Sequence, residues 1–125
     1  MKLARWTFGI AGVYGILVIA PLYFAEGQIA RNDPPPITHP EFFYGFVGVT
    51  LAWQLVFLAI ARDPVRLRPL MLVSVLEKLA YGVPAIVLFM QQRVKAMTLA
   101  FGCIDLVLGA LFVLAFFFTP RSEQS

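Results

Sequence analysis

Four polar residues stand inside long runs of apolar residues, at Gln54, Glu77, Lys78 and Asp105. Two carboxylates and one ammonium can form a buried ion pair, or they can hold and exchange a proton beside a ligand. A charged residue at the centre of a lipid bilayer costs about 2.5 to 3.5 kcal/mol. We therefore expect these side chains to face one another, away from lipid, with Tyr81 on the same helical face as Glu77.

Three interpretations of this polar set stay open. In the first, Lys78 pairs with Asp105 or Glu77, and the network fixes the register of the helices that carry it. In the second, Lys78 neutralises Asp105, and Glu77 exchanges a proton while a ligand or an ion moves. In the third, a charge that is only partly satisfied within the chain finds its partner in another membrane subunit.

The apolar runs that carry these residues have the length of membrane-spanning helices. The chain has 125 residues, of which 60% are hydrophobic and 14% charged, a composition outside the range of soluble domains. A helix that crosses a bilayer needs about 20 apolar residues. We predict one all-α membrane domain over residues 1–125, a four-helix transmembrane bundle with helices near residues 6–25, 41–61, 69–90 and 97–119. These limits place the four polar residues within about 5 Å of the bilayer midplane.

The connections between the helices predict how the helices are arranged. Residues 62–68 and 91–95 are too few to separate the helices they join, which favours antiparallel neighbours and an up-down-up-down bundle. The outer loop, residues 26–40, contains three consecutive prolines, which favour an extended segment rather than a helix. Thr38 and Glu41 have the spacing of a capping box at the start of the second helix.

Basic residues predict the orientation of the bundle. The predicted topology places one group on one side of the membrane: Lys2, Arg5, Arg62, Arg66, Arg68 and Arg121. A smaller group lies on the other side: Arg31, Arg93 and Lys95. Because cytoplasmic loops carry an excess of Lys and Arg, both termini are expected in the cytoplasm, N-in and C-in. In a bacterium this would be a multi-pass protein of the cytoplasmic (inner) membrane, with its long loop in the periplasm.

Two further groups of side chains are candidates for binding. The first lies at the outer mouth, at the start of the second helix: His39, Glu41 and Tyr44. An imidazole and a carboxylate can contribute to a metal or headgroup site, although a helix cap beside an interfacial aromatic belt accounts for the same residues. The second group follows the second helix and is expected to bind anionic lipid headgroups: Arg62, Arg66 and Arg68.

Several classes of function find no support in the sequence. A single cysteine excludes an internal disulfide and a CxxC redox pair. No phosphate-binding loop, nucleophile with an adjacent base or metal-ligand spacing is found, so no catalytic residue, metal or cofactor is predicted and enzyme activity is not expected. The formal net charge of +3 comes from basic residues beside apolar segments, which indicates contact with membrane lipids rather than nucleic acid.

The stretch from His39 to Lys78 resembles the core of small four-helix integral membrane proteins of bacteria, a resemblance that implies no activity. Small multidrug transporters are similar in size, but their essential glutamate lies in the first helix, and no acidic residue occurs here between Trp6 and Ala25. Our leading hypothesis is an accessory or interaction subunit, whose polar cluster fixes the bundle or docks a larger membrane protein. The alternative is a small proton-linked carrier or binding protein for a lipophilic molecule, acting as a homo-oligomer.

Overall fold

The computed structural model describes residues 2–121, and this part of the chain is helical with no strand. In chain order the elements are α1 (Lys2–Ile19), the short 3-10 helix η1 (Ala20–Phe24), α2 (Glu26–Asn32), α3 (Pro40–Arg62), α4 (Arg68–Met90) and α5 (Ala96–Phe118). Four helical segments are each long and apolar enough to cross a membrane: α1 continued by η1, then α3, α4 and α5. The predicted all-α fold with four spanning helices is confirmed, and the chain is a multi-pass membrane protein.

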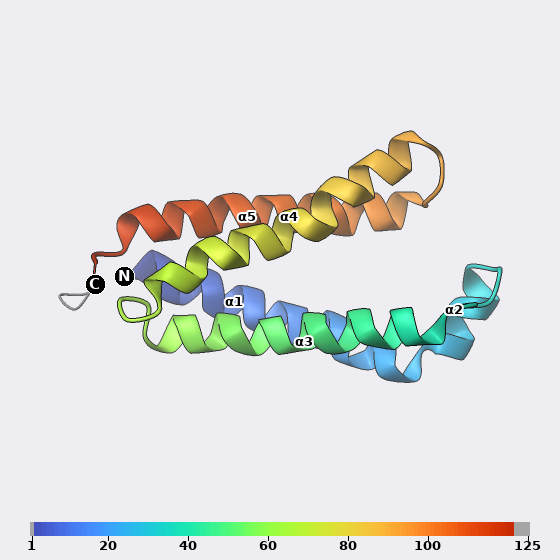
Figure 1. Ribbon diagram of the computed structural model, residues 1–125, viewed down its shortest axis with the longest axis horizontal. Coiled ribbons are helices and arrows are strands. Elements are labelled where there is room, and N and C mark those ends of the chain that lie inside the picture. Colours follow the sequence, from blue (N-terminus) through green and yellow to red (C-terminus); the bar gives the residue numbers. More distant parts are fainter. Residues whose placement is uncertain (1, 122–125) are drawn as a thin grey trace.

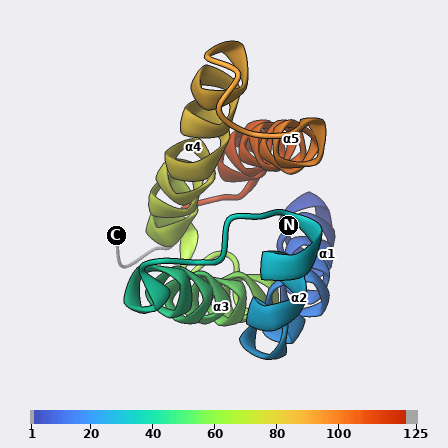
Figure 2. The same cartoon turned by 90° about the vertical axis from the view of Figure 1, so that its right-hand side faces the viewer.

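The long helices pack as two pairs rather than as four equivalent neighbours. α1 packs along α3, and α4 packs along α5 (Figure 1). Figure 2 shows α4 and α5 as one layer above the layer of α1 and α3. Between the layers α1 packs against α5, whereas α3 and α4 meet over only a short stretch. Both chain ends lie at one end of the long axis, and the two pairs diverge toward the other end, where α2 lies (Figure 1).

The helices predicted to be antiparallel neighbours across the second connection, α3 and α4, share only a small contact. The turn between them is tight, with the Leu67 amide donating to the Asp63 carbonyl at 3.1 Å, but it joins only the ends of the two helices. Small residues decide the pairing instead, because they let helix backbones approach closely. A methyl group added to Gly12 of α1 would lie 2.7 Å from Leu58 of α3, and one added to Gly102 of α5 would lie 2.6 Å from Ala85 of α4.

The segment before α3 also differs from the sequence prediction. Part of the loop expected to be extended is helical, because Glu26–Asn32 contains good helix formers and places Glu26 in the first turn and Arg31 in the last. The prolines follow this helix and do not interrupt it. The capping box is also absent: His39 occupies the N-cap of α3, its side chain makes no hydrogen bond that caps the helix, and Pro40 is in the first turn.

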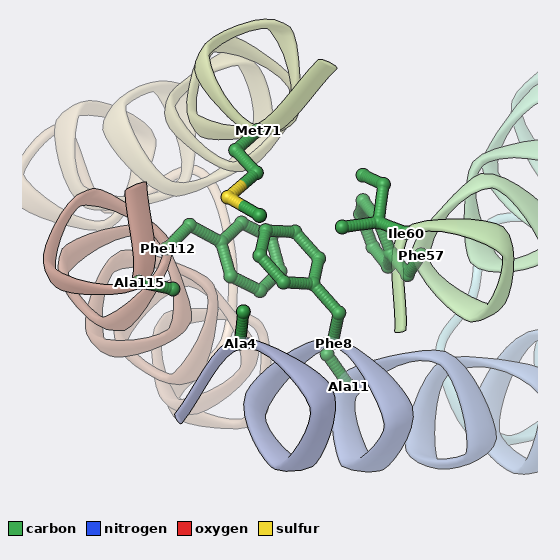
Figure 3. Packing of buried hydrophobic residues seen from close by; sticks show 8 residues of the cluster. All are labelled: Ala4, Phe8, Ala11, Phe57, Ile60, Met71, Phe112 and Ala115. Carbon is green, nitrogen blue, oxygen red and sulfur yellow. The ribbon is translucent and has the colours of Figure 1, made fainter. Parts of the chain in front are cut away.

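A buried aromatic cluster joins the two helix pairs near the chain ends (Figure 3). The ring of Phe8 stacks on that of Phe112 with centroids 4.1 Å apart, and Phe57 meets Phe112 edge-on at 5.0 Å. Met71 of α4 points into the same cluster, so all four long helices contribute to it. Aromatic pairs in these geometries contribute about 0.5 to 1.5 kcal/mol beyond the area they bury.

Basic side chains tie the helix ends together. Arg5 donates to the carbonyls of Ala61 and Arg62 at 3.3 and 3.2 Å, at the C-terminal end of α3. Arg68 donates from Nε to the carbonyls of Phe116 and Thr119 at 3.1 and 2.8 Å, at the C-terminal end of α5. These carbonyls lie at the helix ends and carry the negative end of the helix dipole, so an arginine suits them.

Candidate functional site

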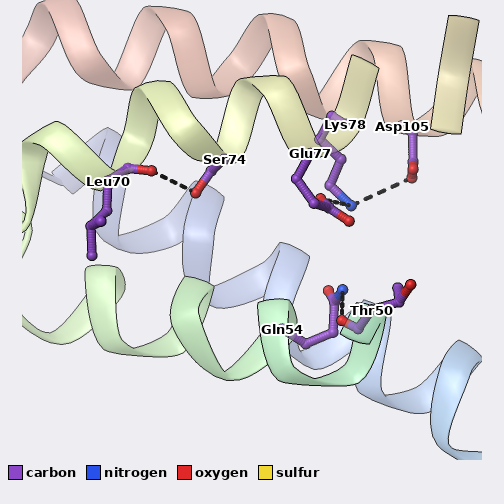
Figure 4. Close-up of polar contacts among 7 residues, drawn as sticks. All are labelled: Thr50, Gln54, Leu70, Ser74, Glu77, Lys78 and Asp105. Atoms are coloured by element: carbon purple, nitrogen blue, oxygen red, sulfur yellow. Dashed lines mark hydrogen bonds and ion pairs between the residues drawn. The ribbon is translucent and has the colours of Figure 1, made fainter. Parts of the chain in front are cut away.

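The charged residues of α4 and α5 form a compact triad in the membrane interior (Figure 4). Lys78 is only 4% exposed, and its Nζ lies 3.5 Å from Oδ1 of Asp105 and 3.6 Å from Oε2 of Glu77. Gly109 of α5 lies against the Cβ of Lys78, so the lysine stem runs close to the α5 backbone. One ammonium thus serves two carboxylates at a contact between two helices.

Gln54 lies across from this triad on α3 and is 1% exposed. Its Nε2 donates to the backbone carbonyl of Thr50 at 2.8 Å, which fixes the orientation of the amide. The Oε1 atom of Gln54 and the Oε2 atom of Glu77 are buried and have no hydrogen-bond partner among residues 2–121. Both atoms are acceptors, and an unsatisfied buried polar group costs about 1 to 3 kcal/mol.

A cavity of about 260 Å³ separates the two helix pairs at this depth, and all four long helices line it. Its polar lining consists of Tyr14, Thr50, Gln54, Glu77, Lys78, Tyr81 and Asp105. The structure therefore brings the five residues predicted from the sequence, Gln54, Glu77, Lys78, Tyr81 and Asp105, to one cavity. The rest of the wall is largely apolar, with Val18, Phe46 and Phe101 among its residues.

Sequence reasoning did not identify Tyr14 of α1 and Phe101 of α5 as parts of this cavity. α1 carries no charged residue at this depth that would indicate which of its faces is buried. The available signal was the adjacent pair Tyr14 and Gly15, a polar-tipped aromatic beside the residue against which the side chain of Gln54 packs.

A second hollow, of about 340 Å³, follows the outside of the molecule between α3 and α4. It shares Phe46, Thr50, Glu77 and Tyr81 with the cavity, so these side chains line both spaces. Its other walls are apolar and include Val49 and Leu76, which are exposed at a depth where lipid surrounds the protein. The groove therefore lies between these shared side chains and the acyl chains of the membrane.

The three residues predicted at the outer mouth do not share one set of contacts. His39 and Glu41 form an exposed pair, with Nδ1 and Oε1 3.3 Å apart. Tyr44 instead donates its hydroxyl to Glu26 of α2 at 2.8 Å. Within residues 2–121, no cluster of three His, Cys, Asp or Glu side chains is arranged to hold a metal ion.

The arginines expected at lipid headgroups also differ from one another. Arg68 is occupied at the end of α5, where its guanidinium stacks 3.7 Å from the centroid of Phe116. Arg66 is exposed and bonds Asp63 at 2.9 Å, and Arg62 is exposed as well. Arg62 and Arg66 thus remain accessible from the membrane surface, whereas Arg68 stabilises the packing of helices.

Charged and hydrogen-bonding groups thus share one cavity with largely apolar walls. Comparison of the chain with protein-family models, with curated proteins and with solved structures finds no match.

Proposed function

We propose that this protein binds a small lipophilic molecule within the membrane, between its two helix pairs, as a carrier or a binding protein. The observation that carries the proposal is the cavity of about 260 Å³ in which two buried acceptors, on Gln54 and Glu77, have no hydrogen-bond partner among the described residues. A polar network that served only to fix helix register would satisfy its own members. Orphaned acceptors beside an empty space are instead suited to a ligand that donates hydrogen bonds to them.

The path to the cavity supports the same proposal. The groove between α3 and α4 gives a molecule dissolved in the bilayer a route to Glu77 that avoids water. The two helix pairs diverge at one end, and α3 and α4 share only a short interface. The distance between the pairs can therefore change when a ligand binds, with little loss of contact between helices. Transport across the bilayer would require an oligomer, since four helices enclose little space.

A second candidate function is an accessory subunit that docks a larger membrane protein. The groove of about 340 Å³ between α3 and α4 favours it, because apolar walls such as Val49 and Val73 can receive a helix of a partner. In this case Glu77, at the meeting point of groove and cavity, would bond a polar residue of that helix.

The proposed location is the inner membrane of a bacterium, with both termini in the cytoplasm. The side that would face the cytoplasm carries Arg62 and Arg66, which would contact anionic headgroups there. This orientation also places α2 and the divergent ends of the two helix pairs on the periplasmic side.

Photolabelling in lipid nanodiscs tests the proposed function. A long-chain alkyl alcohol that carries a diazirine is activated, and the modified residues are mapped on peptides. We expect labels on cavity residues such as Ile19 and Phe101. Val18→Trp fills the cavity and should abolish these labels, whereas Val13→Trp, at an exposed position of the same helix, should leave them. Labels confined to lipid-facing residues such as Leu17 and Leu55 in the unaltered protein would refute the proposal.

A further inference from the structure

The charges that line the cavity do not cancel. Two carboxylates, Glu77 and Asp105, face it with one ammonium, Lys78. Among residues 2–121, the remaining lining groups that can ionise are the phenols of Tyr14 on α1 and Tyr81 on α4, and α3 contributes only uncharged residues, Gln54 among them. With both acids ionised, the cavity therefore carries one negative charge that no group of the lining compensates.

An uncompensated charge in the membrane interior is unfavourable, and the site is complete only when one more positive charge enters it. Lys78 pairs with both acids, its Nζ lying 3.5 Å from Oδ1 of Asp105 and 3.6 Å from Oε2 of Glu77, but one ammonium neutralises only one of two carboxylates. Oε2 of Glu77 accepts no hydrogen bond among the described residues, and the unsatisfied Oε1 of Gln54 lines the same cavity. We therefore place the additional charge beside Glu77.

The missing group must also donate hydrogen bonds. Both orphaned atoms, Oε2 of Glu77 and Oε1 of Gln54, are acceptors, and they approach the cavity from opposite helix pairs (Figure 4). The amide of Gln54 cannot rotate to offer a donor without giving up its bond to the Thr50 carbonyl. A head group with several N–H donors satisfies both atoms at once, which a quaternary ammonium does not.

Aromatic side chains complete the site for a cation. Tyr14, Phe46, Tyr81 and Phe101 line the cavity, and the rings of Phe46 and Tyr81 stack with centroids 6.2 Å apart at its junction with the groove. Ring faces attract cations, most strongly where water is excluded. An alkyl chain attached to the head group would leave through the groove between α3 and α4, along its apolar walls.

We infer that the ligand is an amphiphile with one positive charge, an alkyl ammonium with N–H donors, whose head group binds between Glu77 and Gln54. This inference rests on the proposed function and adds to it the chemical class of the ligand. A proton on the carboxyl group of Glu77 supplies the same charge when the ligand is absent. Ligand and proton therefore compete for one position, which links binding to proton release.

The experiment compares three diazirine probes of equal chain length in nanodiscs: an alkyl primary ammonium, an alkyl alcohol and an alkyl carboxylate. We expect the ammonium probe to label cavity residues at a concentration about tenfold lower than the alcohol, with the carboxylate weakest. Glu77→Gln should weaken the ammonium probe by about tenfold and the alcohol probe much less, because the glutamine amide keeps an acceptor but not the negative charge. Asp63→Asn removes an acidic residue outside the cavity and should alter neither.

Competition with a proton gives a second readout. The alkyl ammonium keeps its charge at neutral and acidic pH, so labelling that weakens as the pH is lowered reports protonation of the site. This dependence should disappear in Glu77→Gln. If that variant is unstable, Gln54→Met, which keeps the side-chain volume but removes the acceptor, should weaken the ammonium probe in the same way.

The outcomes separate the two proposals. Equal labelling of the cavity by all three probes, or an ammonium probe that is insensitive to both variants, overturns the inference and leaves the proposed function standing. The absence of cavity labels with every probe overturns both.

Discussion

Lys78 holds the interior of this protein together because both cavity carboxylates depend on its ammonium group. The lysine approaches Glu77 on its own helix and Asp105 on α5, so it links the polar cavity to the α4–α5 interface. Ser74, one turn away, donates its hydroxyl to the Leu70 carbonyl at 2.8 Å and does not compete for these acids.

Replacing Lys78 by Met should therefore destabilise the protein strongly. The change leaves two buried acids without a counter-ion, and breaking a buried pair in this way costs about 3 to 5 kcal/mol. Lys95→Met is the matched control, because the bond of Lys95 to Asp33 is exposed and worth at most about 1 kcal/mol. Unfolding in mixed micelles of dodecyl maltoside and dodecyl sulfate measures both. Equal losses would show that the triad has no special role in stability.

The acids and the lysine could be placed in a shared interior from the sequence, since a charge within an apolar run has few alternatives in a membrane. Tyr14 and Phe101 could not be placed, because an aromatic residue is equally suited to lipid, to a helix interface or to a cavity wall. Deciding among these surroundings required the relative rotation of α1 and α5, which depends on the packing of the whole fold.

Glycines determine how closely the helices of each pair approach. A Cβ on Gly102 would lie 2.6 Å from the Cβ of Ala85, and neither atom can move without displacing a backbone. The close approach of α4 to α5 in turn places Asp105 within reach of Lys78.

Gly102→Ala should accordingly cost about 1 to 3 kcal/mol, the usual range for overpacking a tight contact. Gly45→Ala on α3 is the control, because a Cβ there would meet nothing within 4 Å. Thermal unfolding in detergent distinguishes the two variants. A tolerated Gly102→Ala would mean that α4 and α5 are not held at the separation described here.

The end of α4 offers a stabilising change. Gln92 has a φ of 61°, in the left-handed region, and its neighbour Arg93 donates its amide to the Leu88 carbonyl at 2.9 Å, as in a Schellman motif. A left-handed residue other than glycine carries a penalty of about 1 to 2 kcal/mol, which Gln92→Gly should recover in part. Gln91→Gly, at a φ of −84°, should give no gain in melting temperature. A higher melting temperature for both variants would contradict this explanation.

Helix positions followed from hydropathy, but helix partners did not. The short connection after Arg62 predicts that α3 and α4 pack together. Instead α3 packs against the glycine-containing face of α1, and α4 packs against that of α5. Likewise Glu26–Asn32 forms a helix although prolines follow it, because proline acts on the residues at and just before it and not on a turn that has already ended.

Along its full length the protein has two dissimilar ends. One carries both chain ends, the arginine contacts and the aromatic cluster around Phe8 and Phe112. At the other, the exposed bond between Lys95 and Asp33 links the connection of α4 and α5 to the segment after α2. Many buried contacts join the two helix pairs at the first end, and an exposed ion pair joins them at the second. This difference suits a cavity between the pairs that has to accommodate a ligand.

Cysteine accessibility tests the predicted orientation of these ends. Cys103→Ser removes the one native cysteine, and Arg66→Cys or Arg93→Cys then introduces a thiol at either end. A membrane-impermeant maleimide added to intact bacterial cells should modify Arg93→Cys and leave Arg66→Cys unmodified until the membrane is permeabilised. The reverse pattern would place both termini outside the cytoplasm.

The division into α1 with α3 and α4 with α5 means that the chain is two helical hairpins in tandem. Most contacts between helices fall within a hairpin. The connection at residues 63–67 serves mainly to keep the two hairpins near each other. Fragments comprising residues 1–66 and 67–125, produced together in one cell, should therefore find each other in the membrane and co-purify. Phe112→Ala removes the aromatic contacts between the two fragments. It should prevent their association while each fragment still inserts into the membrane.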